Sequence, residues 1–317
     1  MFVIDRETVN AIADYRQLVA ALTDMYRTGV DALERTILTQ PAPKGGENDC
    51  LIQTAWMRDK AFGMKIANVF PDNLSKGIPS VVGLYVLFSG TTGEPMATID
   101  GVAETFFKTA SNSAVASDLL ARKDSRVLAM FGAGKLAPHL VKAHAAVRPI
   151  ERVLIWNRTH ANAETLAAEL KAVGLSASAT ADPATAASEA DIVSAATFAT
   201  EPIVKGAWLK PGAHVDLVGG YTPAYREADG EVVKRSGRLY VDSRQSTVGV
   251  CGDVIGPVSE GVLAEAKIAD LFELAQGKAE GRRGPDDITV FKSGGGGHED
   301  LAAALALYAA ARARRAG

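Results

Sequence analysis

One short segment, residues 127–137, constrains the fold of this chain more than any other. It reads VLAMFGAGKLA, five residues typical of a buried strand followed by a G-x-G-x-x-A turn and the start of a helix. Gly132 permits the tight turn, Gly134 lets the backbone approach a pyrophosphate, and Ala137 lets the helix pack closely on the strand. The pattern predicts a Rossmann-type dinucleotide site rather than a merely structural turn. Its predicted contacts are Gly132, Ala133, Gly134, Lys135 and Leu136.

From residue 126 onward, strand and helix patterns alternate. We expect strands at 127–131, 153–156, 191–196, 214–218 and 239–242, with helices at 135–147 and 161–173. Such alternation predicts a doubly wound parallel sheet.

The end of the second predicted strand bears on the type of dinucleotide. About 20 residues beyond the turn, an Asp or Glu normally holds the ribose 2′-OH of NAD. This chain has Asn157, Arg158 and Thr159 instead. Arg158 can pair with a 2′-phosphate, and its neighbours can hydrogen-bond to it. We therefore predict NADP in preference to NAD, the alternative being that Arg158 is a solvated loop cation.

The ends of two later strands add further predicted cofactor contacts. Thr197 follows the third strand, and Val218 and Gly219 end the fourth. Ligands of open α/β sheets bind beyond the carboxyl ends of the strands, although glycines there can also serve turns alone.

Residues 1–122 follow a different pattern. A helical pattern spans 6–30, and several short apolar runs then follow one another without helices between them, which favours an antiparallel or mixed sheet. These runs lie at 51–57, 61–70, 80–88 and 95–99, and a helix is expected at 105–120. After a glycine run at 294–297, an Ala/Leu-rich helix at 299–316 can return to this first part. The prediction is an α/β protein with an α+β substrate and dimerisation domain (1–122, with 298–317 returning to it) and a Rossmann-type domain (123–297).

Composition excludes several classes of function. The net charge is −3, and no run of five basic residues offers a surface for nucleic acid. Two cysteines are too few for a disulfide framework or a cysteine-based zinc site, and HExxH is absent. The start of the chain lacks signal-peptide features, and no apolar run approaches the ~20 residues of a membrane span. We expect a cytoplasmic protein without a metal, nucleic-acid or membrane partner.

Taken together, the motifs resemble those of the ornithine cyclodeaminase/mu-crystallin family over nearly the whole chain. The matching segments, besides the Gly132 turn, are ERTIL (34–38), GMKIANVFPDN (63–73), IPSVVG (78–83), TGEP (92–95), TFFKTA (105–110), VGGYTPAYRE (218–227), FKS (291–293) and EDL (299–301). The resemblance implies a homodimer whose first domain carries the dimer interface and the substrate site, with the nicotinamide in the cleft between domains. It also makes Ser293 a candidate cofactor contact.

The resemblance further implies that Arg35, Lys65 and Lys108 clamp the carboxylate of a small imino or amino acid. Lys65 lies in an otherwise apolar strand, where an unpaired ammonium would be costly, which favours a functional role. Arg35 and Lys108 could also be ordinary solvated cations. Many family members have Arg at position 108, and lysine there loses bidentate carboxylate binding.

Tyr221 marks the branch of the family. Cyclodeaminases have an acidic general base at this strand end, and a phenol, whose ordinary pKa is about 10, is a poor base at neutral pH. The run around Tyr221 is more similar to that of the ketimine reductases, in which the phenol could either hydrogen-bond to the ring nitrogen or wall the pocket. Glu227 and Asp229 could replace the base only if the loop turned them inward.

The prediction is thus an NAD(P)-dependent oxidoreductase acting on C=N/CH–NH. It would reduce Δ1-pyrroline-2-carboxylate or Δ1-piperideine-2-carboxylate to the L-amino acid, with Lys65 and Tyr221 as catalytic residues. The alternatives are an ornithine cyclodeaminase, an amino-acid dehydrogenase and a non-catalytic NADP-dependent binder of small molecules.

Overall fold

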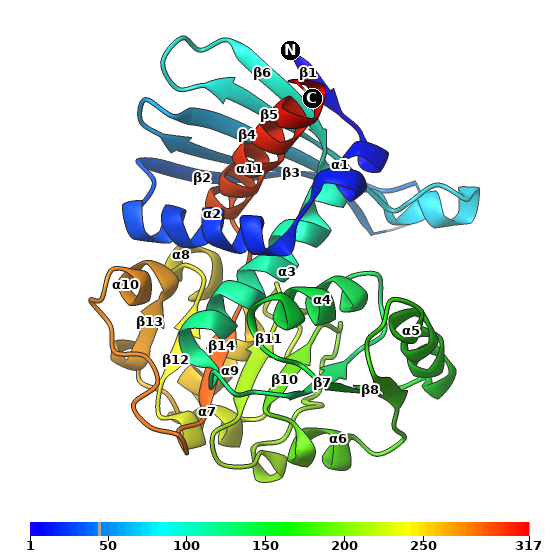
Figure 1. Ribbon diagram of the computed structural model, residues 1–317, viewed down its shortest axis with the longest axis vertical. Helices are drawn as coiled ribbons and strands as arrows, with labels where there is room; N and C mark the ends of the chain where they lie inside the picture. Colours follow the sequence, from blue (N-terminus) through cyan, green and yellow to red (C-terminus); the bar gives the residue numbers. More distant parts are fainter. Residues whose placement is uncertain (44–45, 317) are drawn as a thin grey trace. The chain divides into compact units, whose positions relative to one another are not determined.

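The computed structural model describes residues 1–43 and 46–316, which form two compact units (Figure 1). Unit 1 comprises Met1–Lys108 and Gly296–Gly317, and unit 2 comprises Thr109–Gly295. The end of the chain therefore returns to the first unit. Relative to the predicted bounds, the division falls inside helix α3 (Gly101–Leu120) rather than after it. The second half of α3 belongs to unit 2 because its side chains and carbonyls form hydrogen bonds with residues of that unit. One example is Arg148, which donates to the carbonyl of Ser117.

Unit 1 contains a six-stranded mixed sheet. Its elements are β1 (Phe2–Ile4), α1 (Arg6–Ile12), α2 (Tyr15–Thr28), β2 (Ala32–Pro41), β3 (Glu47–Met57), β4 (Ala61–Val69), the short 3₁₀ helix η1 (Pro71–Lys76), β5 (Val81–Ser89), β6 (Pro95–Asp100), the first part of α3, and α11 (Gly297–Ala316). The strand order is β1-β6-β5-β4-β3-β2, with β1 parallel to β6 and the other pairs antiparallel. The predicted mixed sheet is confirmed.

Several details of unit 1 differ from the sequence prediction, among them the unpredicted strand β1. The single helix expected over 6–30 is wrong, because Asp14 has extended backbone angles and its side chain accepts the N–H of Gln17, which starts a second helix. The prediction also missed β2. Nearly all of its side chains are exposed, so the strand lacks the alternating pattern of a half-buried strand.

Helix α11 packs along one face of this sheet, against β3, β4 and β5 (Figure 1, red). Residues on the covered face are buried in alternation with half-exposed residues on the other face. Arg35, Gln53, Lys65 and Tyr85 are successive register partners across β2, β3, β4 and β5, so they share the face that α11 covers. The topology thus gathers polar side chains beneath a helix.

Unit 2 is the predicted doubly wound domain. Its eight-stranded sheet has the order β13-β12-β14-β11-β10-β7-β8-β9, all pairs are parallel, and helices flank both faces (Figure 1). The strands are β7 (Val127–Phe131), β8 (Arg152–Trp156), β9 (Ala177–Ala179), β10 (Ile192–Ala195), β11 (His214–Leu217), β12 (Leu239–Val241), β13 (Ile268–Asp270) and β14 (Thr289–Lys292). The helices are α4 (Ala137–Val147), α5 (His160–Ala172), α6 (Pro183–Glu189), α7 (Gly230–Ser236), α8 (Arg244–Thr247), α9 (Gly252–Ser259) and α10 (Leu271–Ala275), with 3₁₀ turns η2 (Gly206–Trp208) and η3 (Glu265–Lys267).

The central strands of unit 2 are buried on both faces, which explains their continuous apolar runs. Over the described part of the chain, every helix is too short or too polar to cross a membrane.

Candidate active site

The glycine turn after β7 has the geometry that a dinucleotide requires. Gly132 has φ +104°, and a Cβ there would lie 2.8 Å from the carbonyl oxygen of Ala196 and 2.9 Å from Cγ2 of Thr197. Gly134 is exposed, and a Cβ built on it would meet nothing within 4 Å. Gly132 is therefore required by the fold itself, whereas the space beside Gly134 is open to a ligand.

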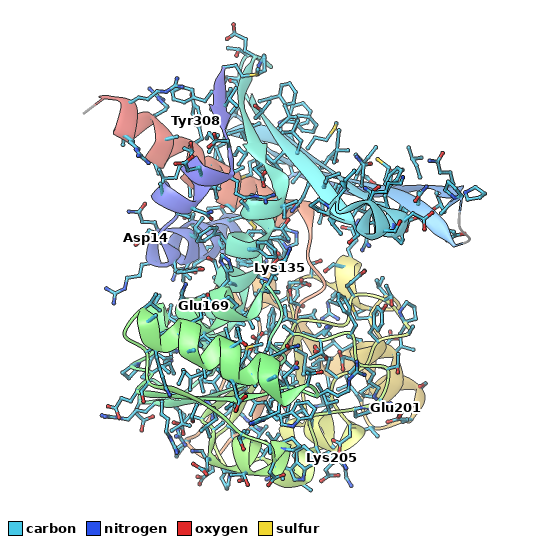
Figure 2. The ribbon with its side chains drawn as sticks, turned by 90° about the vertical axis from the view of Figure 1, so that its right-hand side faces the viewer. Asp14, Lys135, Glu169, Glu201, Lys205 and Tyr308 are labelled. Atoms are coloured by element: carbon cyan, nitrogen blue, oxygen red, sulfur yellow. The ribbon has the colours of Figure 1, made fainter. Side chains whose placement is uncertain are left out.

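Helix α4 begins two residues later than expected, at Ala137, because Lys135 and Leu136 still form the turn (Figure 2 labels Lys135). Its N-cap residue, Leu136, makes no side-chain cap hydrogen bond. No side chain at the cap therefore competes with a ligand for the first N–H groups of the helix, which favour an anion. Ala137 is buried, as close helix–strand packing demands. The turn fits the pyrophosphate of a dinucleotide.

The strand register brings the other predicted cofactor contacts to the same edge of the sheet. Trp156, Phe131, Ala195, Leu217 and Lys292 are successive register partners at the carboxyl ends of five neighbouring strands. The predicted residues that come directly after these ends are Gly132, Asn157, Thr197, Val218, Gly219 and Ser293. They therefore line the edge where ligands of open α/β sheets bind.

At the end of β8, Arg158 and Thr159 are exposed and Asn157 is half-buried. The Asn157 side chain donates to the carbonyl of Thr159 at 2.9 Å, so it shapes the turn as well as facing solvent. The guanidinium of Arg158 is accessible at the edge where the ribose of a dinucleotide would lie.

Tyr221 is 46% exposed and belongs to an aromatic cluster on the loops after β10 and β11. Its ring centroid lies 6.4 Å from that of Phe198 and 6.0 Å from that of Tyr225. The two acidic residues that could have replaced a missing base are both engaged: Asp229 caps α7 by accepting the N–H of Val232, and Glu227 is fully buried.

In unit 1, Lys65 and Lys108 meet in one buried cluster with carboxyl groups. The ammonium of Lys65 donates to Glu104 at 2.9 Å and to Asp300 at 3.2 Å, and it also bonds the hydroxyl of Thr105. Three donors are all that an ammonium has, so those of Lys65 are occupied within the protein.

Lys108 has two carboxylate partners in the same cluster. Its ammonium lies 2.8 Å from Glu299 and 3.3 Å from Asp300, and all three groups are at most 5% exposed. Asp300 thus bridges the two lysines. This burial excludes the alternative that Lys108 is an ordinary solvated cation.

Arg35, the third predicted cation, lies on β2 in the same row as Lys65 but is exposed. One strand, β3, lies between the two residues, and two inter-strand spacings put their backbones roughly 10 Å apart. Arg35 therefore presents a charge to solvent on the face whose centre holds the buried cluster.

Within the cluster, the pKa of one carboxyl group is raised and that of another is lowered. Burial raises the pKa of Glu104 from 4.5 to about 7, although Lys65 opposes the shift. The pKa of Asp300 is lowered despite burial, because Lys108 and Lys65 both face it. Two ammonium groups face three carboxyl groups, so a proton on Glu104 balances the charge of the cluster.

This predicts a pH dependence of stability. The proton on Glu104 stabilises the fold fully below pH 4.5, and this contribution is lost as the pH rises through about 7. We expect the free energy of unfolding of the wild type, relative to Glu104→Gln, to fall between these values and to be level outside them. Urea unfolding at a series of pH values measures the difference, and a constant difference would contradict the assignment.

Sequence reasoning missed Glu104 and Tyr85. Glu104 lies four residues before Lys108 on α3, a spacing that could have suggested the charged cluster. The Tyr85 ring is fully buried over Gly63, where a Cβ would lie 1.8 Å from the phenol oxygen. Burial, with Asp300 and Glu104 nearby, raises the pKa of Tyr85 well above its ordinary value. The strand register, which pairs Tyr85 on β5 with Lys65 on β4, places this phenol beside the cluster, and no local sequence pattern shows it.

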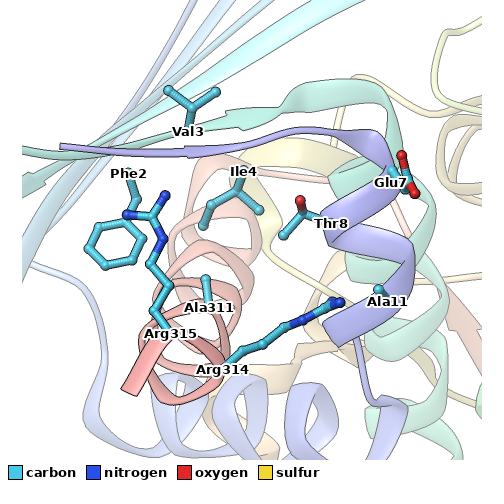
Figure 3. Close-up of a pocket in the computed structure, with 9 residues that line it drawn as sticks. All are labelled: Phe2, Val3, Ile4, Glu7, Thr8, Ala11, Ala311, Arg314 and Arg315. Carbon is cyan, nitrogen blue, oxygen red and sulfur yellow. The ribbon is translucent and has the colours of Figure 1, made fainter. Parts of the chain in front are cut away.

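Another hollow lies elsewhere in unit 1. A pocket of about 340 Å³ is bounded by β1, α1 and the end of α11, and contains none of the predicted site residues (Figure 3). In the described ranges, no three His, Cys, Asp or Glu side chains are grouped to hold a metal ion.

Comparison with known proteins identifies relatives that match most of the chain. The model of the ornithine cyclodeaminase/mu-crystallin family matches residues 28–315. A Δ1-pyrroline-2-carboxylate reductase of Paracoccus denitrificans is 41% identical over 251 residues, which are 78% of this chain and 79% of that protein.

Solved structures with a similar fold include the following two. That of Thermococcus litoralis Δ1-pyrroline-2-carboxylate reductase, in complex with NADH and L-proline, has a TM-score of 0.90 and 31% identity, covering 99% of this chain and 98% of that one. An archaeal alanine dehydrogenase dimer with bound NAD has a TM-score of 0.88 and 26% identity, covering 100% and 98%.

Proposed function

Because the chain belongs to the ornithine cyclodeaminase/mu-crystallin family, we propose that it reduces a small cyclic imino acid to the L-amino acid with NAD(P)H. Relatives named as Δ1-pyrroline-2-carboxylate reductases support the same branch that the sequence predicts. The observation that carries the choice is Tyr221, which occupies the strand end where a cyclodeaminase has its acidic base. With Asp229 capping a helix and Glu227 buried, the loop offers no free carboxylate for ring closure.

The buried cluster of unit 1 complements the charges of an imino acid. Such a substrate carries a carboxylate beside a nitrogen that can be protonated, so it needs a cation and a carboxyl group close together. Lys65 and Lys108 alternate with Glu104 and Asp300, and Arg35 adds an exposed guanidinium on the same face. We assign the substrate carboxylate to the three cations, where it would replace one of the three acceptors that Lys65 bonds, and the substrate nitrogen to the carboxyl groups.

The dinucleotide is assigned to unit 2. Its pyrophosphate would be held by the turn from Gly132 to Leu136 and its nicotinamide half by residues 197, 218, 219 and 293. When bound, a reduced nicotinamide supplies hydride for the carbon of the C=N bond. The chain's own part is to hold the cofactor against the strand ends and to keep the substrate oriented.

The preference for NADP rests on Arg158. We expect NADPH to bind several-fold more tightly than NADH, because the exposed guanidinium can pair with a 2′-phosphate that NADH lacks. Fluorescence titration of both nucleotides measures this. Arg158→Ala should remove the difference, and exposed Lys171 on α5 offers a control, Lys171→Ala, that should keep it. Tighter binding of NADH by the wild type would overturn the preference.

The function itself is tested with the wild-type protein. We expect oxidation of NADPH with Δ1-pyrroline-2-carboxylate or its six-membered analogue, followed at the absorbance band of the reduced nucleotide. Ornithine with oxidised cofactor should release little ammonia, because a missing positioned base costs roughly 10²–10⁴-fold in rate. Ammonia release without imine reduction would establish the cyclodeaminase. Oxidation of a linear amino acid alone would establish a dehydrogenase, and binding without turnover a non-catalytic protein.

Tyr221→Phe separates the two roles of the phenol within the same assay. A loss near tenfold would indicate a hydrogen bond to the ring nitrogen, and no loss a wall of the pocket.

The homodimer is also part of the proposal. The sheet face opposite Lys65 carries exposed apolar side chains, among them Leu38 (57% exposed), Val82 (39%) and Leu84 (43%). A sheet face of this kind normally needs a cover, and a second copy of the chain would supply it, which sedimentation equilibrium tests. The cytoplasmic location stays a prediction.

A further inference from the structure

The loops that follow β10 and β11 are joined by a single carboxylate, that of Glu227. One of its oxygens, Oε1, accepts the backbone N–H of Thr197 at 2.7 Å and the Thr197 hydroxyl at 2.8 Å. The other, Oε2, accepts the N–H of Gly219 at 2.7 Å. Glu227 therefore satisfies donors from two neighbouring strand ends at once, and it also closes its own loop from 219 to 227.

The two strand ends are in close contact as a result. A Cβ added at Gly219 would lie 2.0 Å from the carbonyl oxygen of Thr197 and 2.7 Å from Oε1 of Glu227. No side chain fits at position 219, so the glycine is explained by close approach and not only by a turn. Three short bonds and a glycine thus fix the spacing of the loops.

Glu227 is itself held by buried charges. Asp253, on α9, accepts the N–H groups of Glu227 at 2.8 Å and Ala228 at 3.1 Å through Oδ1. Its other oxygen lies 3.4 Å from the ammonium of Lys292, at the end of β14. All three charged side chains are at most 1% exposed. Lys292 directly precedes Ser293, so the cluster reaches the end of a third strand.

Stability alone does not explain a buried cluster of this kind. Burying ion pairs costs several kcal/mol per charge, and apolar residues of similar size are often equally stabilising. A carboxylate does, however, supply what no apolar residue can, namely two acceptors of fixed geometry for the N–H groups of two loops at the ligand-binding edge of the sheet. Thr197, Gly219 and Ser293 are all predicted cofactor contacts.

We propose that Glu227 is a positioning residue that sets the loops after β10 and β11 to receive the nicotinamide half of the dinucleotide. Asp253 holds the backbone of Glu227, and Lys292 pairs with Asp253. This inference rests on the proposed function. It also removes Glu227 from the candidates for a general base, because its oxygens are committed to the backbone.

The hydrogen bonds of Glu227 also position the aromatic cluster formed by Phe198, Tyr221 and Tyr225. Phe198 follows Thr197, and the two tyrosines lie within the loop that Glu227 closes. The position of Tyr221 beside a bound nicotinamide therefore depends on the Glu227 carboxylate.

The test uses Glu227→Gln in the full chain. A glutamine side chain has one acceptor oxygen, so its NH₂ group must face the N–H of either Thr197 or Gly219, and the loops must shift. We expect the Kd for NADH, measured by nucleotide fluorescence, to rise at least tenfold. The KM for NADH should rise with it by a similar factor. The control is Glu201→Gln, an exposed glutamate in the loop after β10 (labelled in Figure 2), which should leave the NADH Kd within twofold.

A second variant, Glu227→Asp, separates positioning from charge balance. It keeps the carboxylate charge near Asp253 and Lys292, so it should be at least as stable as the single glutamine variant, and it serves if that variant does not fold. Its side chain is one methylene shorter and cannot reach Thr197 and Gly219 together. We expect its NADH affinity to remain at least tenfold weakened. Recovery of both stability and affinity would overturn the proposal, as would a folded Glu227→Gln protein that binds NADH normally. Failure of the wild type to bind any dinucleotide would instead refute the proposed function along with this inference.

Discussion

Replacing Lys65 with Met is expected to cost the protein both activity and stability. Methionine keeps the apolar stem but removes the ammonium, which leaves the Glu104 carboxyl group buried without its cation and leaves Asp300 with only Lys108. Breaking a buried pair in this way costs about 3–5 kcal/mol of unfolding free energy. The kcat/KM for the imino acid should fall by roughly 10–10³-fold, on the order of one buried charged hydrogen bond or more. Urea unfolding and steady-state kinetics measure the two losses.

A double variant distinguishes structure from catalysis at this position. Lys65→Met/Glu104→Gln removes the carboxyl group that has lost its cation, so it should recover part of the stability while the activity stays low. The NADH affinity of both variants should match the wild type, because the dinucleotide turn belongs to unit 2. Recovery of activity together with stability would mean that Lys65 serves only the fold.

The second large effect is expected at the glycine turn, where two neighbouring glycines should behave differently. Gly134→Ala should fold with unchanged stability, because its Cβ meets no atom within 4 Å, yet it should bind NADH at least tenfold more weakly. The added methyl would occupy the space that a pyrophosphate needs. Differential scanning fluorimetry and nucleotide titration measure the two quantities.

Gly132→Ala supplies the contrast. Its φ of +104° and the 2.8 Å approach to the Ala196 carbonyl make any side chain strained. We expect a destabilisation of about 1–3 kcal/mol in addition to weaker NADH binding. Normal NADH affinity in a folded Gly134→Ala protein would argue against pyrophosphate binding at this turn.

The dinucleotide turn could be read from the sequence because its requirements are local. A strand end, two glycines and a helix start within eleven residues fix the path of the backbone, and the path alone creates the anion site. The strand ends that carry Thr197 and Gly219 were predictable for a related reason, since parallel strands in a doubly wound sheet end at a common edge. The apolar pattern did not predict where every helix starts. It indicated one continuous helix over 6–30, but Asp14 caps the start of a second helix there.

The pairing of charges could not be read in this way. The family resemblance singled out Lys65 and Lys108 as site cations but did not assign their partners. Asp300 lies 235 residues beyond Lys65 and reaches it only because α11 packs on the sheet. The sequence also could not predict whether the Glu227 side chain is buried, since an acidic residue in a loop can face solvent or the interior. The sequence by itself determined the backbone path of the cofactor turn and the family. The tertiary structure decided which charges are buried together, because contacts between distant segments depend on packing, which no local pattern encodes.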